Sequence, residues 1–359
     1  MGQLAFPYVF MRAGTSRGPY FRREDLPNNL DALAEILIGV IGSGHHNNID
    51  GIGGGTAVTT KVAMLSQAQD GWADIDYFFA QVSVDDRIVD FKPTCGNILA
   101  GVGPAALELG LMQAQGEVTE IKIHACNTGA RVIAHVQTPG GVIDYAGSCA
   151  IAGVLGTAAP IHLEFLDVVG SSTGEFLPTG NLVDTIDDVD VTCMDVAMPM
   201  VIARASDFGL RADESMADLD QNAQFFAKME KIRIAAGALM GMEDVTKSVI
   251  PKFAIVAQPH AGGNFSARYF MPWKTHPGMA VTGGQCLATC YLTPGTVMDG
   301  LRAQKSSSPT NIAIEHPSGV LDVMMHYEFT DRFILHSAGL VRTARKLADG
   351  YIYAPNDHH

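Results

Sequence analysis

Apolar and polar residues alternate in short runs along most of the chain, which is the pattern of β-strands with one buried face. Turns rich in Gly, Pro and Asn separate these runs. In the first half we predict strands at residues 6–10, 19–21, 59–65, 75–84, 121–125, 131–137 and 142–145. In the second half we predict strands at residues 191–195, 199–202, 253–257, 267–271, 312–316, 320–326 and 333–341.

Four segments favour helices instead, at residues 30–41, 98–111, 218–239 and 284–291. The segment 98–111 is apolar nearly all round, as a buried helix would be, and Pro93 and Gly96 disfavour a helix before Asn97. Cys95 would then stand at a helix N-terminus, which attracts anions and lowers a thiol pKa. A buried structural cysteine before a core helix is the alternative interpretation.

The two halves contain a repeat with three landmarks in one order. Lys61 and Lys252 are 191 residues apart, Tyr77 and Tyr269 are 192 apart, and Cys95 and Thr282 are 187 apart. We therefore predict an α+β protein of two pseudo-repeated domains, each an antiparallel or mixed sheet wrapped around a central apolar helix. The predicted domains are residues 1–187, completed by 341–359, and residues 188–340. If the halves face each other, the active site lies in the cleft between them.

Composition limits the classes of function that remain. The formal charge of −14 over 359 residues argues against nucleic acid and anionic membranes as partners. No run of eighteen apolar residues occurs, and the N-terminus lacks a basic region followed by an apolar one, so we expect neither membrane insertion nor secretion. Six cysteines without a CxxC pair fit a reducing cytoplasm better than a disulfide framework or a zinc site.

Several ordered motifs occur along the chain, namely Met11-Arg12-Ala13-Gly14-Thr15-Ser16-Arg17-Gly18, Asp50-Gly51-Ile52-Gly53-Gly54, Thr60-Lys61-Val62-Ala63, Cys95-Gly96-Asn97, Ile314-Glu315-His316-Pro317-Ser318-Gly319 and Val341-Arg342-Thr343-Ala344-Arg345. Together they resemble the 2-methylaconitate isomerase (PrpF) family, and in particular its 4-oxalomesaconate tautomerases. The resemblance covers nearly the whole chain. It implies the two-domain fold of diaminopimelate epimerase.

The resemblance also implies which residues carry the chemistry. Epimerases of that fold use two cysteines, and here Cys95 matches the first, whereas Thr282 occupies the second position. A two-thiol racemase is therefore not expected. The family's isomerases are thought to use a lysine base, which corresponds to Lys61. Arg17 stands where the family usually has lysine, and other changes near the expected pocket leave the exact substrate open.

We expect Lys61 and Cys95 to be the catalytic residues. Lys61 would be the general base if it points into a closed site, and a surface lysine if it extends to solvent. Cys95 would either reprotonate the substrate or only shape the carboxylate site. The expected substrate-binding residues are Thr15, Ser16, Arg17, Gly96, Asn97, Arg268, His276, Thr282, Gly283 and Gly284.

Other candidate sites carry less weight. His316 could be a site residue or a structural histidine. The loop 50–55 lacks the spacing of a nicotinamide-binding motif, and adjacent His45 and His46 seldom point at one ion, so we expect no metal and no cofactor.

The sequence thus predicts a cofactor-independent isomerase or tautomerase that shifts a proton within an unsaturated di- or tricarboxylate. The expected substrate is 4-oxalomesaconate in aromatic-acid catabolism, with 2-methylaconitate as the alternative. An amino-acid epimerase and a non-catalytic carboxylate binder remain as rivals from other classes. The expected compartment is the cytoplasm, and a homodimer is the assembly to be tested.

Overall fold

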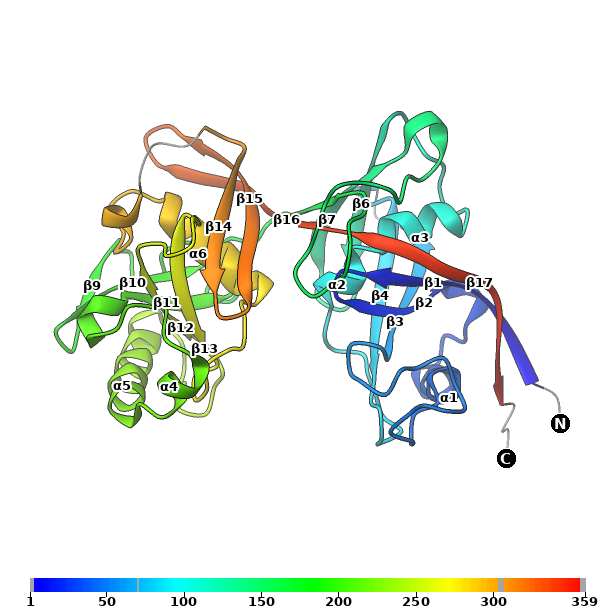
Figure 1. Ribbon diagram of the computed structural model, residues 1–359, viewed down its shortest axis with the longest axis horizontal. Coiled ribbons are helices and arrows are strands. Elements are labelled where there is room, and N and C mark those ends of the chain that lie inside the picture. Colours follow the sequence, from blue (N-terminus) through cyan, green and yellow to red (C-terminus); the bar gives the residue numbers. More distant parts are fainter. Residues whose placement is uncertain (1–2, 70, 303–306, 356–359) are drawn as a thin grey trace. The chain divides into compact units, whose positions relative to one another are not determined.

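The computed structural model describes residues 3–69, 71–302 and 307–355 (Figure 1). The chain divides into two compact units, one comprising Met1–Phe165 and Val341–His359 and the other Leu166–Leu340. The boundary differs from the expected position after residue 187. Residues 166–187 join the second unit because Asp195 of that unit accepts hydrogen bonds from the backbone of Ser172 and Thr173, at 2.8 and 2.7 Å.

The first unit contains a mixed sheet. Its strands follow one another in the order β17 (Ala344–Pro355), β1 (Gln3–Ala13), β2 (Ser16–Arg22), β3 (Lys61–Gln67), β4 (Ile75–Val82), β6 (Val118–Ala125), β7 (Ala130–Gln137) and β8 (Ile161–Phe165). The β2–β3 and β4–β6 pairs are parallel, and the other pairs in this order are antiparallel. The two-residue strand β5 (Val89–Asp90) adds to β4.

The second unit repeats this arrangement. Its strands follow in the order β9 (Asp184–Ile186), β10 (Val189–Asp195), β11 (Pro199–Arg204), β12 (Lys252–Ala257), β13 (Phe265–Phe270), β14 (Thr310–His316), β15 (Gly319–Phe329) and β16 (Phe333–Arg342). The β11–β12 and β13–β14 pairs are parallel, at the same places in the order as in the first unit. The predicted α+β class with an internal repeat is confirmed.

Each unit has a long helix in the connection between the two strands of its first parallel pair, β2 and β3 in the first unit and β11 and β12 in the second. Helix α1 (Leu30–Ile41) has the predicted bounds, because Asn29 caps its start through Ala32 N–H and Gly42 ends it in the left-handed conformation. Its counterpart α5 (Ala223–Leu239) buries Met229 and Ile232.

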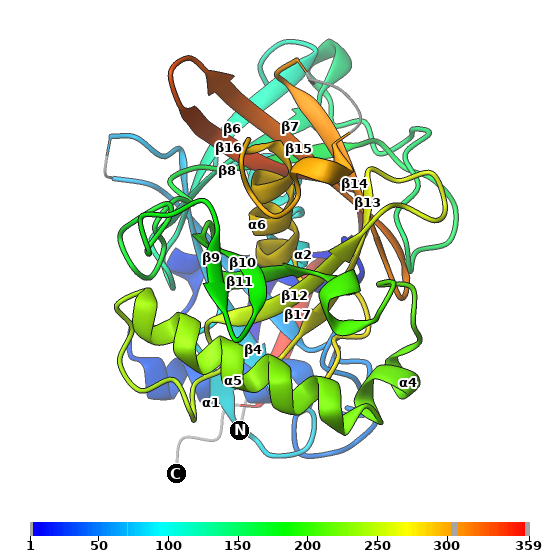
Figure 2. The same cartoon turned by 90° about the vertical axis from the view of Figure 1, so that its left-hand side faces the viewer.

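The helix predicted at 218–239 is in fact two helices. A short α4 (Met216–Asp220) precedes α5, and the side chain of Asn222 starts the second helix by accepting a hydrogen bond from Phe225 N–H at 3.0 Å. Figure 2 shows α5 and α6 of this unit with strands lying between them.

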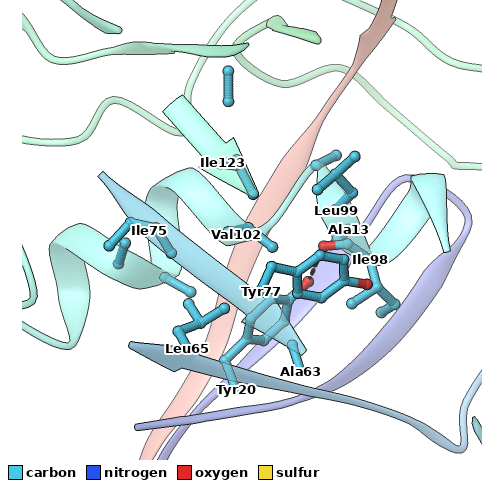
Figure 3. Close-up of a cluster of buried hydrophobic side chains, with 14 of the residues drawn as sticks. Ala13, Tyr20, Ala63, Leu65, Ile75, Tyr77, Ile98, Leu99, Val102 and Ile123 are labelled. Carbon is cyan, nitrogen blue, oxygen red and sulfur yellow. Dashed lines mark hydrogen bonds between the residues drawn. The ribbon is translucent and has the colours of Figure 1, made fainter. Parts of the chain in front are cut away.

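A second helical segment in each unit lies in an apolar core. In the second unit this is α6 (Val281–Leu292), in which every residue from Gly283 to Leu292 is buried. In the first unit the predicted single helix at 98–111 is wrong, because it forms two short helices, α2 (Gly96–Leu99) and α3 (Val102–Glu108). The break follows from Pro104, which has no N–H to donate to the carbonyl of Ala100. Ile98, Leu99 and Val102 pack near Tyr20 and Tyr77 (Figure 3).

Other predictions of local structure were wrong. Residues 142–145 form no strand; Gly140 and Gly141 turn the chain with φ of 64° and 81°, and Asp144 N–H donates to Gln137 C=O at 2.9 Å. Strands β1 and β2 extend beyond the predicted runs at 6–10 and 19–21, so that only Gly14 and Thr15 lie between them. Strands β5, β8, β9 and β17 were not predicted.

Short 3-10 helices complete the secondary structure at η1 (Arg23–Asp25), η2 (Pro139–Gly141), η3 (Ala205–Phe208) and η4 (Asp299–Leu301). Within the described ranges, no helix has the length and apolar character needed to cross a membrane.

Candidate active site

Lys61 is the first residue of β3 and is half-buried. Its Nζ donates a hydrogen bond of 2.6 Å to Oε1 of Gln81, which lies directly opposite on β4, and sits 5.4 Å from the ring centroid of Phe79. The amide nitrogen of Gln81 donates to Oγ1 of Thr60 at 3.1 Å, which directs its oxygen toward the lysine. The partner of the amine is therefore neutral, so proton loss from Lys61 would leave no carboxylate unpaired.

Cys95 precedes α2 as its N-cap residue and is half-buried against the first unit's core. Its carbonyl accepts a hydrogen bond from Leu99 N–H at 2.9 Å. Because α2 has only four residues, the macrodipole at this end is weaker than the predicted long helix would give. Burial raises the pKa of Tyr20 and Tyr77 well above the usual range, and the neighbouring Cys95 adds to both shifts. Both phenols therefore stay protonated beside the thiol.

Tyr20 connects the sheet to this helix. Its hydroxyl donates a hydrogen bond of 2.6 Å to the carbonyl of Ile98, drawn as a dashed line in Figure 3. A side chain at Gly101 could not fit beside it, since a Cβ there would lie 2.2 Å from the Tyr20 hydroxyl. The tyrosine thus fixes the helix that carries Cys95 against β2.

The turn between β1 and β2 brings three of the predicted binding residues together. Nδ2 of Asn97 donates to Oγ1 of Thr15 at 3.0 Å. Gly14 has a φ of 53°, and a Cβ there would lie 2.2 Å from Oδ1 of Asn97. This close approach places Thr15 and Ser16 beside the start of α2.

Two polar side-chain atoms at this turn are buried. In the part of the chain that the structure describes, Oγ of Ser16 and Nε of Arg17 form no hydrogen bond. Buried donors without partners are rare in folded proteins and often belong to a ligand site. Ser16 and Arg17 are therefore available to bind an oxyanion.

Arg17 is held by its surroundings. Its guanidinium carbon lies 5.7 Å from the ring centroid of Phe10, and its backbone N–H donates to Val58 C=O at 3.0 Å. A Cβ at Gly54 would lie 2.5 Å from the Arg17 guanidinium. The glycine-rich loop at 50–55 thus packs closely against Arg17.

The second unit contains the remaining predicted residues. Arg268 on β13 is 6% exposed, and its guanidinium donates to Glu214 C=O and Ala267 C=O, both at 2.9 Å. Burial lowers its pKa, while Glu214, Asp213 and Glu315 act in the opposite direction. Backbone carbonyls therefore already occupy part of its donor capacity.

His276 and Thr282 also have partners in this unit. Nδ1 of His276 accepts a hydrogen bond from Gly278 N–H at 3.0 Å, and burial lowers its pKa. Oγ1 of Thr282 donates to Sδ of Met198 at 3.3 Å.

Gly283 and Gly284 allow close packing in the first turn of α6. A Cβ at Gly283 would lie 2.9 Å from the Tyr269 ring, and a Cβ at Gly284 would lie 2.4 Å from Leu321. These glycines therefore let the helix approach β13 and β15.

Sequence reasoning missed Gln81 as the partner of Lys61. Gln81 sits within the alternating pattern of the predicted strand at 75–84, which could have placed it on the face of Lys61. Lys252 was noted only as a repeat landmark. Burial lowers its pKa, and the nearby Arg233 lowers it further. His316 is a neighbour of His276, and burial is the main cause that lowers its pKa to about 4.

Groups that could bind a metal lie elsewhere in the first unit. The rings of His45 and His46 stack with centroids 4.4 Å apart. Asp76 on β4, His124 on β6 and Cys126 directly after β6 bring three potential ligand atoms together, with His124 Nδ1 and Asp76 Oδ1 separated by 2.9 Å. Burial raises the pKa of Cys126 to about 11, so the thiol is protonated at neutral pH and is a poor ligand in that form.

Comparisons with known proteins show the family to which the chain belongs. The sequence profile of the PrpF protein family matches residues 3–355. The (4E)-oxalomesaconate Delta-isomerase of Novosphingobium sp. (strain KA1) is 44% identical over 347 residues, which cover 97% of each chain. The 4-oxalomesaconate tautomerase of Pseudomonas putida is 41% identical over 357 residues, covering 99% of this chain and 98% of that one.

A solved structure also matches nearly the whole chain. The crystal structure of methylitaconate-delta-isomerase superposes with a TM-score of 0.90 at 33% identity, covering 99% of this chain and 96% of that one. The protein therefore belongs to the PrpF family, as its motifs predicted, and it is an isomerase.

Proposed function

We propose that this isomerase shifts a proton across a keto–enol or allylic system in an unsaturated polycarboxylate, with 4-oxalomesaconate as the substrate. The observation that carries the proposal is the placement of Lys61 beside a neutral amide, in the unit that also holds the unpartnered donors of Ser16 and Arg17. Two relatives over 40% identical along nearly their whole length are named for reactions of oxalomesaconate.

In this proposal Lys61 removes a proton from a carbon that lies between a carboxylate and a conjugated carbonyl. The electron pair moves into the conjugated system and gives an enolate. Donors fixed before the reaction stabilise that charge best, and Ser16 and Arg17 are the candidates. Lys61 then returns the proton to the distant carbon or oxygen, so atoms and electrons balance and no cofactor is consumed.

Cys95 has two possible roles in this scheme. It could deliver the second proton from its place before α2, or it could only shape the site with Gly96 and Asn97. We favour Lys61 as the sole acid and base, because the second unit has Thr282 where a thiol pair would need cysteine. For the same reason an amino-acid epimerase is the weaker alternative.

The other candidate binding residues belong to the second unit. We propose that Arg268, His276 and the first turn of α6, with Thr282, Gly283 and Gly284, recognise a second carboxylate. We also propose a role in aromatic-acid catabolism. The cytoplasm is the proposed compartment, since six scattered cysteines without a CxxC pair fit a reducing environment.

The experiment that tests the reaction is a spectrophotometric assay of the purified protein with 4-oxalomesaconate, in which turnover changes the absorbance of the conjugated system. The activity should persist unchanged in EDTA. A parallel assay with 2-methylaconitate tests the alternative substrate. If neither acid is turned over, the proposed reaction is wrong.

A carboxylate-binding protein without catalysis is separated from an enzyme by Lys61→Ala. A pure binder would keep its ligand affinity and have no turnover to lose. The proposed isomerase would keep measurable substrate binding and lose turnover.

A further inference from the structure

Three arginines lie side by side on the sheet of the first unit. Arg345 on β17 is directly opposite Arg12 on β1, and Arg12 is directly opposite Arg17 on β2. Directly opposite residues project from the same face of a sheet, and like charges in that position destabilise it. The row is unexpected in a chain with a formal charge of −14. A carboxylate or a bound anion would compensate this charge, and solvent also screens the exposed Arg345.

No protein carboxylate provides that compensation among the residues the structure describes. Arg12 donates through Nη1 alone, to Thr343 C=O at 2.7 Å, Thr343 Oγ1 at 3.0 Å and Gly14 C=O at 3.1 Å. Its other guanidinium N–H groups make no hydrogen bond within the described ranges. Burial lowers the pKa of Arg12, and Arg345 lowers it further.

Arg12 and Arg345 line a pocket of about 530 Å³. Its walls are β1, β17 and the loop at 145–158, and its described lining contains three cationic side chains and no carboxylate. The third cation, Lys346, is already neutralised, because its Nζ lies 2.8 Å from Glu108 and 2.6 Å from Asp349. The uncompensated charge of the pocket therefore comes from Arg12 and Arg345.

We propose that Arg12 and Arg345 form a second binding site for a compact oxyanion with at least two negative charges, distinct from the substrate site at Lys61. Guanidinium groups bind planar carboxylates and phosphates through paired N–H donors, so both a polycarboxylate and a phosphate have suitable chemistry. The pocket volume is sufficient for either ion.

Isothermal titration calorimetry with inorganic phosphate and with citrate tests this site in the full chain. Arg345→Gln should weaken binding of the preferred ion by about tenfold or more, since one charge-assisted contact contributes roughly 1.5–3 kcal/mol. Arg345 is exposed, so the variant should fold normally. Tighter binding of citrate would identify a polycarboxylate site, and tighter binding of phosphate would identify a phosphate site.

Two further variants make the result specific. Arg87→Gln removes the same charge from an exposed arginine of the same unit, which pairs with Glu35 away from the pocket, and should leave the dissociation constant unchanged. The Ser16→Ala/Lys61→Ala double variant should also bind the ion normally. The proposal would be overturned by wild-type affinity in Arg345→Gln or by loss of binding in the double variant. It would also be overturned if neither ion bound at 10-millimolar concentrations, which correspond to a binding free energy of about 3 kcal/mol. The turnover assay is independent of these measurements.

Discussion

The two units share one scaffold but differ in the polar groups at corresponding positions. The two units can be aligned by matching Lys61 on β3 with Lys252 on β12. The registers of the parallel pairs β2–β3 and β11–β12 then match Ser16 with Met198. In the first unit, Oγ of Ser16 is buried without a partner among the described residues. In the second, Sδ of Met198 accepts from the Tyr269 hydroxyl at 3.2 Å and from Thr282 at 3.3 Å. Among the described residues, the first unit thus has a hydroxyl without a partner at this position, whereas the second has a sulfur acceptor that already receives two hydrogen bonds.

A second contrast concerns the spacing of the strands. The same alignment places Gly18 against Met200. A Cβ at Gly18 would lie 1.8 Å from the carbonyl oxygen of Lys61, whereas Met200 is a fully buried side chain. The first unit therefore requires a glycine beside its lysine, and the second does not. A duplicated fold can keep its strand order while one copy specialises for chemistry.

The largest expected effect is the difference in kcat between variants of the two aligned lysines. Lys61→Ala should lower kcat for 4-oxalomesaconate by on the order of a thousandfold or more, because it removes the proposed base. Lys252→Ala is the matched control from the other unit and should change kcat by less than about threefold. Steady-state kinetics on both variants, with circular dichroism to verify folding, makes the comparison. Equal losses in the two variants would show that the units do not differ as proposed.

The next effect concerns stability rather than catalysis. Gly18→Ala should lower the free energy of unfolding by roughly 3 kcal/mol, because backbone atoms must move to admit the methyl group. Gly300→Ala is the control, since a Cβ at Gly300 meets nothing within 4 Å, and it should change stability by less than about 0.5 kcal/mol. Urea denaturation measures both. A Gly18→Ala protein as stable as the wild type would contradict the close approach at Lys61.

A smaller effect is expected at the thiol. If Lys61 acts alone, Cys95→Ser should change kcat by less than about fivefold and act mainly on KM. Cys126→Ser, at a thiol outside the proposed site in the same unit, controls for thiol oxidation. If Cys95→Ser is as inactive as Lys61→Ala, and the double variant loses little more than either, the cysteine is the partner acid.

The smallest effects are opposite pH dependences of stability in the two units. The pKa of His316 is lowered from 6.5 to about 4. The neutral ring therefore contributes fully to the stability of the folded state above pH 6.5, and this contribution is lost as the pH falls toward 4. Hydrogen bonding to Glu164 raises the pKa of His135 above 6.5. The protonated His135 therefore contributes fully to the stability of the folded state below pH 6.5, and this contribution is lost as the pH rises.

Melting temperatures between pH 4.5 and 8 test this contrast. His316→Gln should reduce the loss of stability on the acid side, and His135→Gln should reduce the loss on the alkaline side. If both substitutions changed the dependence of the melting temperature on pH in the same way, the opposite effects expected for His316 and His135 would be wrong.

The sequence by itself determined much of the local structure. Helix α1 has its predicted bounds because Asn29 and Gly42 encode its two ends locally. Most strands were predicted because an alternating pattern depends only on neighbouring residues. The repeat was visible because its landmarks keep their order and spacing. The motifs also indicated the family and the chemical class of the reaction.

Tertiary structure decided which distant residues meet. Pairing of β1 with β17 places Arg12 opposite Arg345, although more than 300 residues separate them. The partner of Lys61 depends on the register between β3 and β4, and the unpartnered Ser16 is visible only once its surroundings are known. Strand pairing and burial are non-local, because the hydrogen-bond partner of a residue is set by the packing of the whole unit rather than by its neighbours in sequence.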